Sequence, residues 1–167
     1  MSEKDKVIEE KVKYNGIFDW RETYQFIHRW LIEEGYKVEE HKYQEQIQGD
    51  EKNIEIKWIA EKNISDYFRN EIKMTFRIYG LKKVEVEKNG KRVKINEGGF
   101  EVGITGSLVK DYQSTWENNP SMKFLRGVYD KYIIEGTVKK YSKALFNDVQ
   151  DLSDQIKAFL SIEARKQ

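Results

Sequence analysis

The sequence predicts an α+β domain in which a curved antiparallel sheet packs on long C-terminal helices, and two patterns lead to this prediction. Apolar and charged residues alternate along most of residues 36–112, which is typical of half-buried strands. Apolar residues recur every three or four positions within residues 119–163, which is typical of amphipathic helices. A strand and a helix precede these segments, and we expect a single domain, residues 1–167.

The composition excludes several classes of protein. The 30 Lys and Arg residues nearly balance the 29 Asp and Glu residues. A nucleic-acid-binding domain usually carries a basic excess, so we do not expect a nucleic-acid partner. The absence of cysteine excludes disulfides and thiolate metal sites. No run approaches the roughly 20 apolar residues that cross a bilayer, and we expect a cytoplasmic protein.

The N-terminal segment predicts a strand followed by a helix. Apolar residues alternate with charged ones over residues 6–14, which favours a strand. Asp19 and Glu22 have the spacing of a capping box, and Gly35 stands where a helix commonly ends. We therefore expect a helix over residues 19–34. Its broad apolar stripe is formed by Trp20, Tyr24, Phe26, Ile27, Trp30 and Leu31.

Residues 36–112 predict a meander of six antiparallel strands. The alternation slips before Tyr43, which indicates a bulge in the first of them. Turns are expected at residues 49–50, 63–66 and 89–90, and again at the Gly98-Gly99 pair. The glycines at 103 and 106 lie inside an alternating strand, where they indicate a bend or the close approach of a helix.

The hairpin around Asn89-Gly90 can be registered residue by residue. This dipeptide is typical of a type I′ turn, in which both central residues need a positive φ angle. A two-residue loop pairs Lys88 with Lys91 and sets the register of both strands. The register then places apolar residues opposite apolar ones and acids opposite bases: Val86 with Val93, Val84 with Ile95, Glu87 with Arg92, and Glu85 with Lys94.

The C-terminal segment, residues 119–163, predicts two helices that are separated near Gly136. Asn119-Pro120 is typical of a helix start. An apolar stripe then runs from Val138 to Phe159 in steps of three and four, over a helix of about 25 residues. This stripe is expected to pack on the sheet; the alternative is that it instead, or also, forms an intermolecular coiled coil. Polar residues near the seam, Asp148 and Gln155, count against a strict coiled coil.

This order of elements resembles the helix-grip fold of the START and Bet v 1-like superfamily. In that fold a curved antiparallel sheet wraps a long C-terminal helix and leaves a cavity between them. The chain departs from it in having one longer helix after the first strand, where those proteins have two short ones, and in the break near Gly136. The resemblance implies a binding cavity between sheet and helix.

Candidate binding residues follow from this layout. Five apolar or aromatic residues are expected to line a cavity for an apolar small molecule: Trp58, Met74, Phe76, Ile104 and Tyr132. Trp116 differs from them because it lies in a polar loop, residues 113–119. It either plugs the end of the sheet or anchors a protein partner.

No catalytic, cofactor or metal site is predicted. His28 and His41 could share a metal with Glu40 or Glu45, but their spacing matches no metal-binding motif. Glu71 lies on the polar phase of its strand, where we expect a structural salt bridge. We do not expect an enzyme.

The sequence therefore predicts a non-catalytic binding protein for an apolar small molecule. The alternative is a protein-interaction or assembly module, including a homodimer, that uses the long C-terminal helix and the surface of the sheet.

Overall fold

The computed structural model describes residues 3–113, 120–132 and 135–165. The elements in chain order are β1 (Glu3–Ile17), α1 (Trp20–Glu33), β2 (Lys37–Gln48), β3 (Glu51–Asn63), β4 (Phe68–Lys88), β5 (Lys91–Lys110), α2 (Pro120–Tyr132) and α3 (Glu135–Arg165). The predicted α+β class is confirmed.

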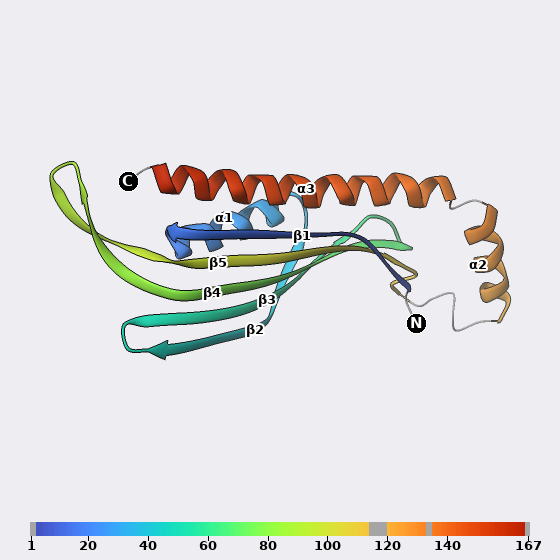
Figure 1. Cartoon of the computed structure of the whole chain (residues 1–167). Helices are drawn as coiled ribbons and strands as arrows, with labels where there is room; N and C mark the ends of the chain where they lie inside the picture. The colour runs from blue at the N-terminus through green and yellow to red at the C-terminus, as the bar shows by residue number, and fades with distance from the viewer. Residues whose placement is uncertain (1–2, 114–119, 133–134, 166–167) are drawn as a thin grey trace.

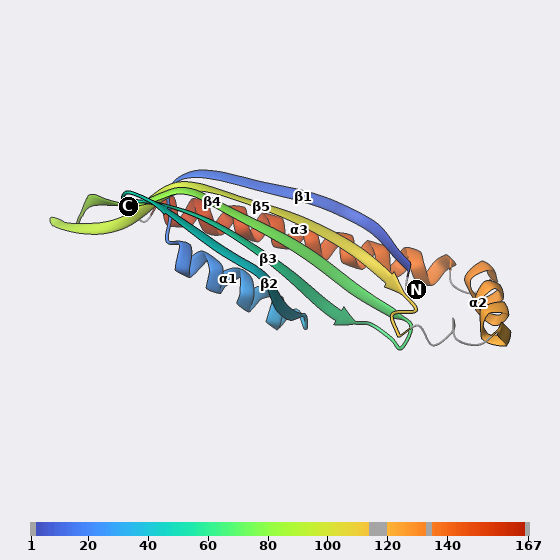
Figure 2. The same cartoon turned by 90° about the horizontal axis from the view of Figure 1, so that it is seen from below.

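The five strands form one antiparallel sheet in the order β1-β5-β4-β3-β2. The sheet is curved, and α1 and α3 lie on the same side of it (Figures 1 and 2). We call this side the covered face and the opposite side the uncovered face. α3 packs mainly on β1 and β5, and it also contacts α1.

The prediction of six strands in residues 36–112 is wrong, because four long strands span this segment. β4 continues through Gly80, which has a φ of 63°, and the β4–β5 register shifts by one residue beside it. A bulge of this kind bends a strand without ending it. β5 likewise runs through the Gly98-Gly99 pair, which was predicted to be a turn.

The predicted register of the Asn89-Gly90 hairpin is confirmed at every pair from Lys88–Lys91 to Val84–Ile95. Asn89 and Gly90 have φ angles of 53° and 77°, as a type I′ turn requires. The predicted bulge in β2 is also confirmed, since the register with β3 shifts between Glu40 and Lys42.

The predicted start of α1 is confirmed. Asp19 precedes the helix, and its Oδ1 accepts a hydrogen bond from the Glu22 backbone amide at 3.1 Å. Gly35 follows the helix with a φ of 90°, a left-handed angle that favours glycine. These contacts place the aromatic side of α1 on β3 and β4, where Tyr24 contacts Trp58 with ring centroids 4.9 Å apart.

The long stripe of α3 packs on the sheet, as one of the two predicted alternatives requires. Its fully buried residues are Leu145, Val149, Leu152 and Ile156. α3 crosses β5 at Gly106, where there is no room for a side chain. A Cβ at this position would lie 2.9 Å from Val149 Cγ2. Gly106 therefore marks a close helix approach, as predicted, whereas a Cβ at Gly103 would meet nothing within 4 Å.

One buried polar cluster joins α3 to the sheet. The Tyr36 hydroxyl donates to Asp148 Oδ2 at 3.0 Å and accepts from Asn70 Nδ2 at 3.4 Å. Burial, and then the charge of Asp148, raise the pKa of Tyr36. Asp148 is thus a docking residue of α3, which explains a polar residue beside its apolar stripe.

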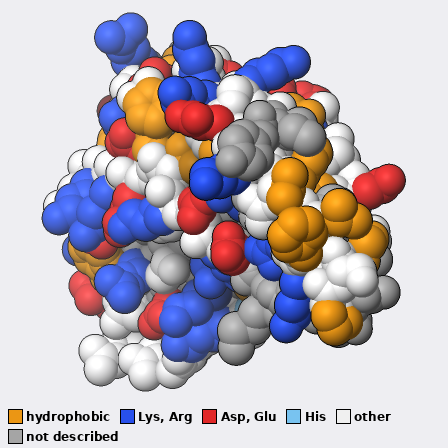
Figure 3. Space-filling model, turned by 90° about the vertical axis from the view of Figure 1, so that its right-hand side faces the viewer, with side chains coloured by type: hydrophobic (Ala, Val, Ile, Leu, Met, Phe, Trp, Pro, Cys, Tyr) orange, Lys and Arg blue, Asp and Glu red, His pale blue; other side chains and the backbone are white. Residues whose placement is uncertain are grey.

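α2 lies beyond the end of the sheet (Figures 1 and 2). Arg126 attaches it there through ion pairs of 3.5 Å to both Asp111 and Glu3. Tyr129 adds an edge-to-face contact with Tyr67, with ring centroids 5.9 Å apart. Apolar side chains gather on the surface of this end of the molecule (Figure 3).

Candidate functional site

Four of the predicted cavity residues come together, but inside the hydrophobic core. Trp58 pairs with Met74 across β3 and β4, and Met74 pairs with Ile104 across β4 and β5. Phe76 contacts Trp58 with ring centroids 4.8 Å apart. Each of the four side chains is at most 1% exposed. They fill the space between the sheet and α1, where the predicted ligand would lie.

The structure does not describe the side chains of the other two predicted binding residues. Tyr132 is the last residue of α2, the helix beyond the end of the sheet. Trp116 lies outside the described residues, so its role as a partner anchor stays a prediction.

The two histidines lie in different surroundings. His28 makes an edge-to-face contact with Trp58, with ring centroids 5.7 Å apart. His41 lies at the β2 bulge, with its Nε2 3.6 Å from Glu39. Among the described residues, no group of three or more His, Cys, Asp or Glu side chains is placed to hold a metal ion.

The uncovered face of the sheet carries acidic and basic side chains that pair across the strands. Glu101 pairs with Lys11 at 2.8 Å and Glu55 with Lys42 at 3.2 Å. The hydrogen bonds from these lysines are the main reason that the pKa of both carboxyls is lowered. The predicted salt bridge of Glu71 is confirmed, since its Oε2 lies 2.9 Å from Lys4 Nζ.

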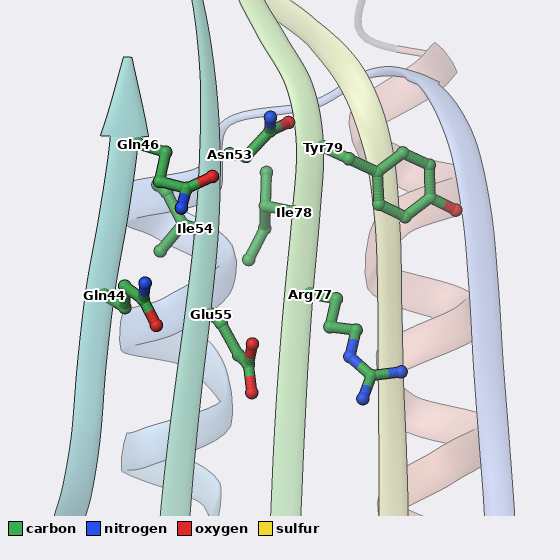
Figure 4. Close-up of a pocket in the computed structure, with 8 residues that line it drawn as sticks. All are labelled: Gln44, Gln46, Asn53, Ile54, Glu55, Arg77, Ile78 and Tyr79. Atoms are coloured by element: carbon green, nitrogen blue, oxygen red, sulfur yellow. The ribbon is translucent and has the colours of Figure 1, made fainter.

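One part of this face is hollowed and carries mostly uncharged side chains (Figure 4). The hollow has a volume of about 220 Å³ and is lined by Gln44, Gln46, Asn53, Ile54, Glu55, Arg77, Ile78 and Tyr79. Asn53 is held in place because its Oδ1 accepts from the Gly80 backbone amide at 2.8 Å. The Tyr79 ring lies over Gly99, where a Cβ would come within 2.0 Å of the ring.

The far half of the β4–β5 hairpin projects beyond the rest of the sheet (Figure 1). The pairing of β3 with β4 ends at Leu81, and the pairing of β1 with β5 ends at Glu97. We call residues 82–97 the arm. At the base of the arm, Ile17 pairs with Glu97 and the Phe18 amide donates to the Asn96 carbonyl at 3.1 Å. Beyond this base, within the described part of the chain, its two strands pair only with each other.

The arm carries its apolar residues on the uncovered side. Side chains two apart on a strand share a face, so Val93 and Ile95 lie on the same side of β5 as Glu101. Their partners across the arm are Val86 and Val84. Three of these side chains are partly exposed, and Val93 is 42% exposed.

The arm also concentrates positive charge. It contains six Lys and Arg residues and three Glu residues, a net charge of +3, although the whole chain has a net charge of only +1. The tip, Lys88 to Arg92, contributes three of the basic residues. A partner for the arm would therefore be acidic and would offer an apolar strip.

A second opening lies on the covered face, where the sheet extends past the start of α1. It has a volume of about 540 Å³ and is lined by Trp20, Tyr43, Glu45, Asp50, Lys52, Ile54, Leu81, Lys82, Lys83 and Asn96. Its apolar side chains belong to the helix and to three strands, and its lysines and acids are the polar part of the lining.

Two of these features were missed in the sequence, although each leaves a signal there. The arm is marked by a change of phase, since apolar residues of β5 are odd-numbered up to Ile95 and even-numbered from Phe100 to Leu108. The apolar surface of α2 is marked by the adjacent pair Phe124-Leu125, because this pair widens the apolar stripe beyond the part of a helix that packing on one neighbour buries.

Comparisons of the chain with protein-family models, with curated proteins and with solved structures find no match. The resemblance to helix-grip proteins therefore stays a prediction. None of the described helices combines the length and the apolar character that crossing a bilayer would need.

Proposed function

We propose that the chain is a non-catalytic protein-interaction module that binds an acidic protein partner through its arm. The observation that carries the proposal is the placement of Val84, Val86, Val93 and Ile95 on the side of the hairpin that no described helix covers. Exposure of aliphatic side chains to water is unfavourable, and contiguous exposed apolar patches commonly mark binding surfaces.

Charge supports a partner of opposite sign. The arm carries a net charge of +3, so two arms from separate copies of the chain would repel each other. Nucleic acid fits less well, because Glu85 and Glu87 lie among the bases and the four aliphatic side chains make poor phosphate contacts. An acidic protein surface satisfies both the charge and the apolar strip.

The test combines affinity capture with defined variants of the arm. Val86→Thr with Val93→Thr removes two cross-strand aliphatic partners but keeps β-branched residues that suit a strand. Glu85→Gln with Lys94→Gln is the matched control, since it changes a pair on the other face and leaves the net charge unchanged. Captured proteins are identified, purified and titrated against each variant by calorimetry.

We expect one acidic protein whose affinity falls about tenfold or more with the threonine variant and weakens at high salt. The control variant should bind as the unaltered chain does. The proposal is wrong if both variants bind equally, if light scattering shows a dimer that only the threonine variant dissociates, or if an oligonucleotide competes for the arm.

The small-molecule prediction is a second candidate, and the opening beside Trp20 is what favours it. Its lining includes Tyr43, Ile54 and Leu81, so an apolar molecule could lie between the sheet and α1 without displacing the core. Thermal-shift screening with fatty acids and sterols tests it. A hit should be lost with Tyr43→Ala and kept with Tyr79→Ala, a similarly exposed tyrosine on the opposite face.

A further inference from the structure

α2 turns its apolar side to solvent. Phe124 is 73% exposed, Leu125 is 50% exposed and Val128 is 38% exposed. These positions share one side of the helix. The other side carries Arg126 and Tyr129, which hold α2 to the end of the sheet. The helix is therefore docked by a polar and aromatic side, and its most apolar side is left without a described partner.

The position of α2 makes this side accessible to a large flat surface. The helix lies beyond the end of the sheet in both views (Figures 1 and 2). Apolar side chains gather at this end of the molecule, with lysine and arginine side chains nearby (Figure 3). A surface that approaches from this end meets α2 before it meets the strands.

The charge of the helix suits an anionic surface. Residues 120–132 contain three basic residues and one acidic residue, a net charge of +2. Two of the bases, Lys123 and Lys131, are exposed. Lysine can lay its methylene stem along an apolar surface while its ammonium group reaches a phosphate. Phenylalanine, leucine and lysine on one exposed helix are typical of helices that lie in a bilayer interface.

The size of the apolar patch argues against a second copy of the chain or another protein. α2 has 13 residues, and a helix of that length is roughly 20 Å long. A stable protein interface takes about 800 Å² and 20–30 residues from each partner. Three exposed side chains supply only a fraction of that area. A bilayer needs no matching shape, and its surface charge adds to the attraction.

We propose that α2 docks the protein on an anionic lipid surface. Phe124 and Leu125 enter the boundary between headgroups and acyl chains, and Lys123 faces the headgroup phosphates. The proposal does not depend on the function of the arm, since the arm projects from the opposite end of the molecule (Figure 1). A protein bound in this way would keep the arm away from the bilayer.

The experiment measures flotation of the full chain with two kinds of vesicle. One is phosphatidylcholine alone, and the other contains roughly a third phosphatidylserine. Phe124→Ser with Leu125→Ser removes the apolar contacts at two exposed positions. Ile47→Ser is the matched control, because Ile47 is 66% exposed on β2. Lys123→Gln tests the charge, and circular dichroism checks that every variant is folded.

We expect binding to the anionic vesicles only, with loss of about tenfold or more in the serine double variant and no change with Ile47→Ser. Lys123→Gln should weaken binding about fivefold, and high salt should weaken it further. Absence of binding to anionic vesicles overturns the proposal, as does equal binding by the double variant. So does a concentration-dependent dimer that the double variant abolishes, because a second copy would then cover α2.

Discussion

The two halves of the β4–β5 hairpin place their apolar side chains on opposite sides. In the half next to the helices, Met74, Phe76 and Val102 lie on the covered face and are buried. In the arm, Val86 and Val93 lie on the uncovered side, and none of the described helices packs on them. The change occurs at the Gly80 bulge of β4 and near the Gly98-Gly99 pair of β5.

This difference separates stability from binding within one hairpin. The inner half is held by helices and by neighbouring strands on both sides, so its side chains determine whether the protein folds. Beyond its base at Asn96 and Glu97, the arm has only its own hydrogen bonds and cross-strand pairs among the described residues, and an isolated hairpin is marginally stable in water. Substitutions in the two halves should therefore have very different effects on unfolding.

The largest expected effect is from Phe76→Ala. Phe76 is fully buried and contacts Trp58, Trp20 and Phe100. Truncation of a buried aromatic residue leaves a cavity and should lower the free energy of unfolding by about 3–5 kcal/mol. Val86→Ala in the arm should change it by less than about 0.5 kcal/mol. Urea denaturation measures both, and similar losses would contradict the separation of the two halves.

The comparison also shows how far the sequence predicts this fold. Local signals predicted correctly the Asp19 cap, the β2 bulge and the complete register around Asn89-Gly90, because turn and cap chemistry act over a few residues. The strand count was wrong because the Gly98-Gly99 pair was interpreted as a turn and because β4 was divided near Gly80, although both strands continue through these glycines. Phase alone does not distinguish a turn from a strand whose apolar residues change sides.

The candidate sites were harder to predict for a related reason. Trp58 and Phe76 were placed correctly on one face of the sheet, but periodicity gives no information on whether α1 fills the space above them. The apolar surface of α2 depends on Arg126, which pairs with Asp111 and Glu3 at the end of the sheet. Contacts between such distant residues leave no periodic signal.

Two glycines of β5 sharpen the comparison between the faces of the sheet. A Cβ at Gly106 would lie 2.9 Å from Val149 and 3.1 Å from Ile8, so Gly106→Ala should cost about 1–3 kcal/mol by overpacking under α3. A Cβ at Gly103 would meet nothing within 4 Å, so Gly103→Ala should be neutral within about 0.5 kcal/mol. Thermal unfolding measures both, and an equal cost would mean that α3 does not press on β5.

Two tyrosines, Tyr36 in the polar cluster under α3 and Tyr24 on α1, predict that the free energy of unfolding depends on pH. Burial and Asp148 raise the pKa of Tyr36 above its ordinary value of 10.0, and burial with the Glu40 hydrogen bond raises that of Tyr24 to about 12. Above pH 10 the unfolded chain loses these protons first, so the free energy of unfolding should fall as pH rises toward 12 and beyond. Tyr36→Phe should make this fall shallower.

At neutral pH the same substitution removes the hydrogen bond that Asp148 accepts, at a cost of about 1.5 kcal/mol. Urea denaturation at pH 7 and pH 11 measures the two effects separately. Tyr79→Phe is the control, since Tyr79 is 46% exposed on the uncovered face of the sheet. An unchanged slope in the Tyr36 variant would show that this tyrosine does not link folding to pH.

The smallest effect on global unfolding is expected at the tip of the arm. Gly90 has a φ of 77°, and a Cβ there should cost the arm about 1 kcal/mol through backbone strain. Because the arm can open without unfolding the helices and the inner half, the urea midpoint should stay unchanged. Amide exchange at Val84, Val86 and Val93 should instead become about fivefold faster. Asn89→Gly, which keeps the turn angles accessible, should leave exchange slow. A shift of the urea midpoint with Gly90→Ala would mean that the arm unfolds together with the core, and that its exposed aliphatic side chains contribute to stability as well as to binding.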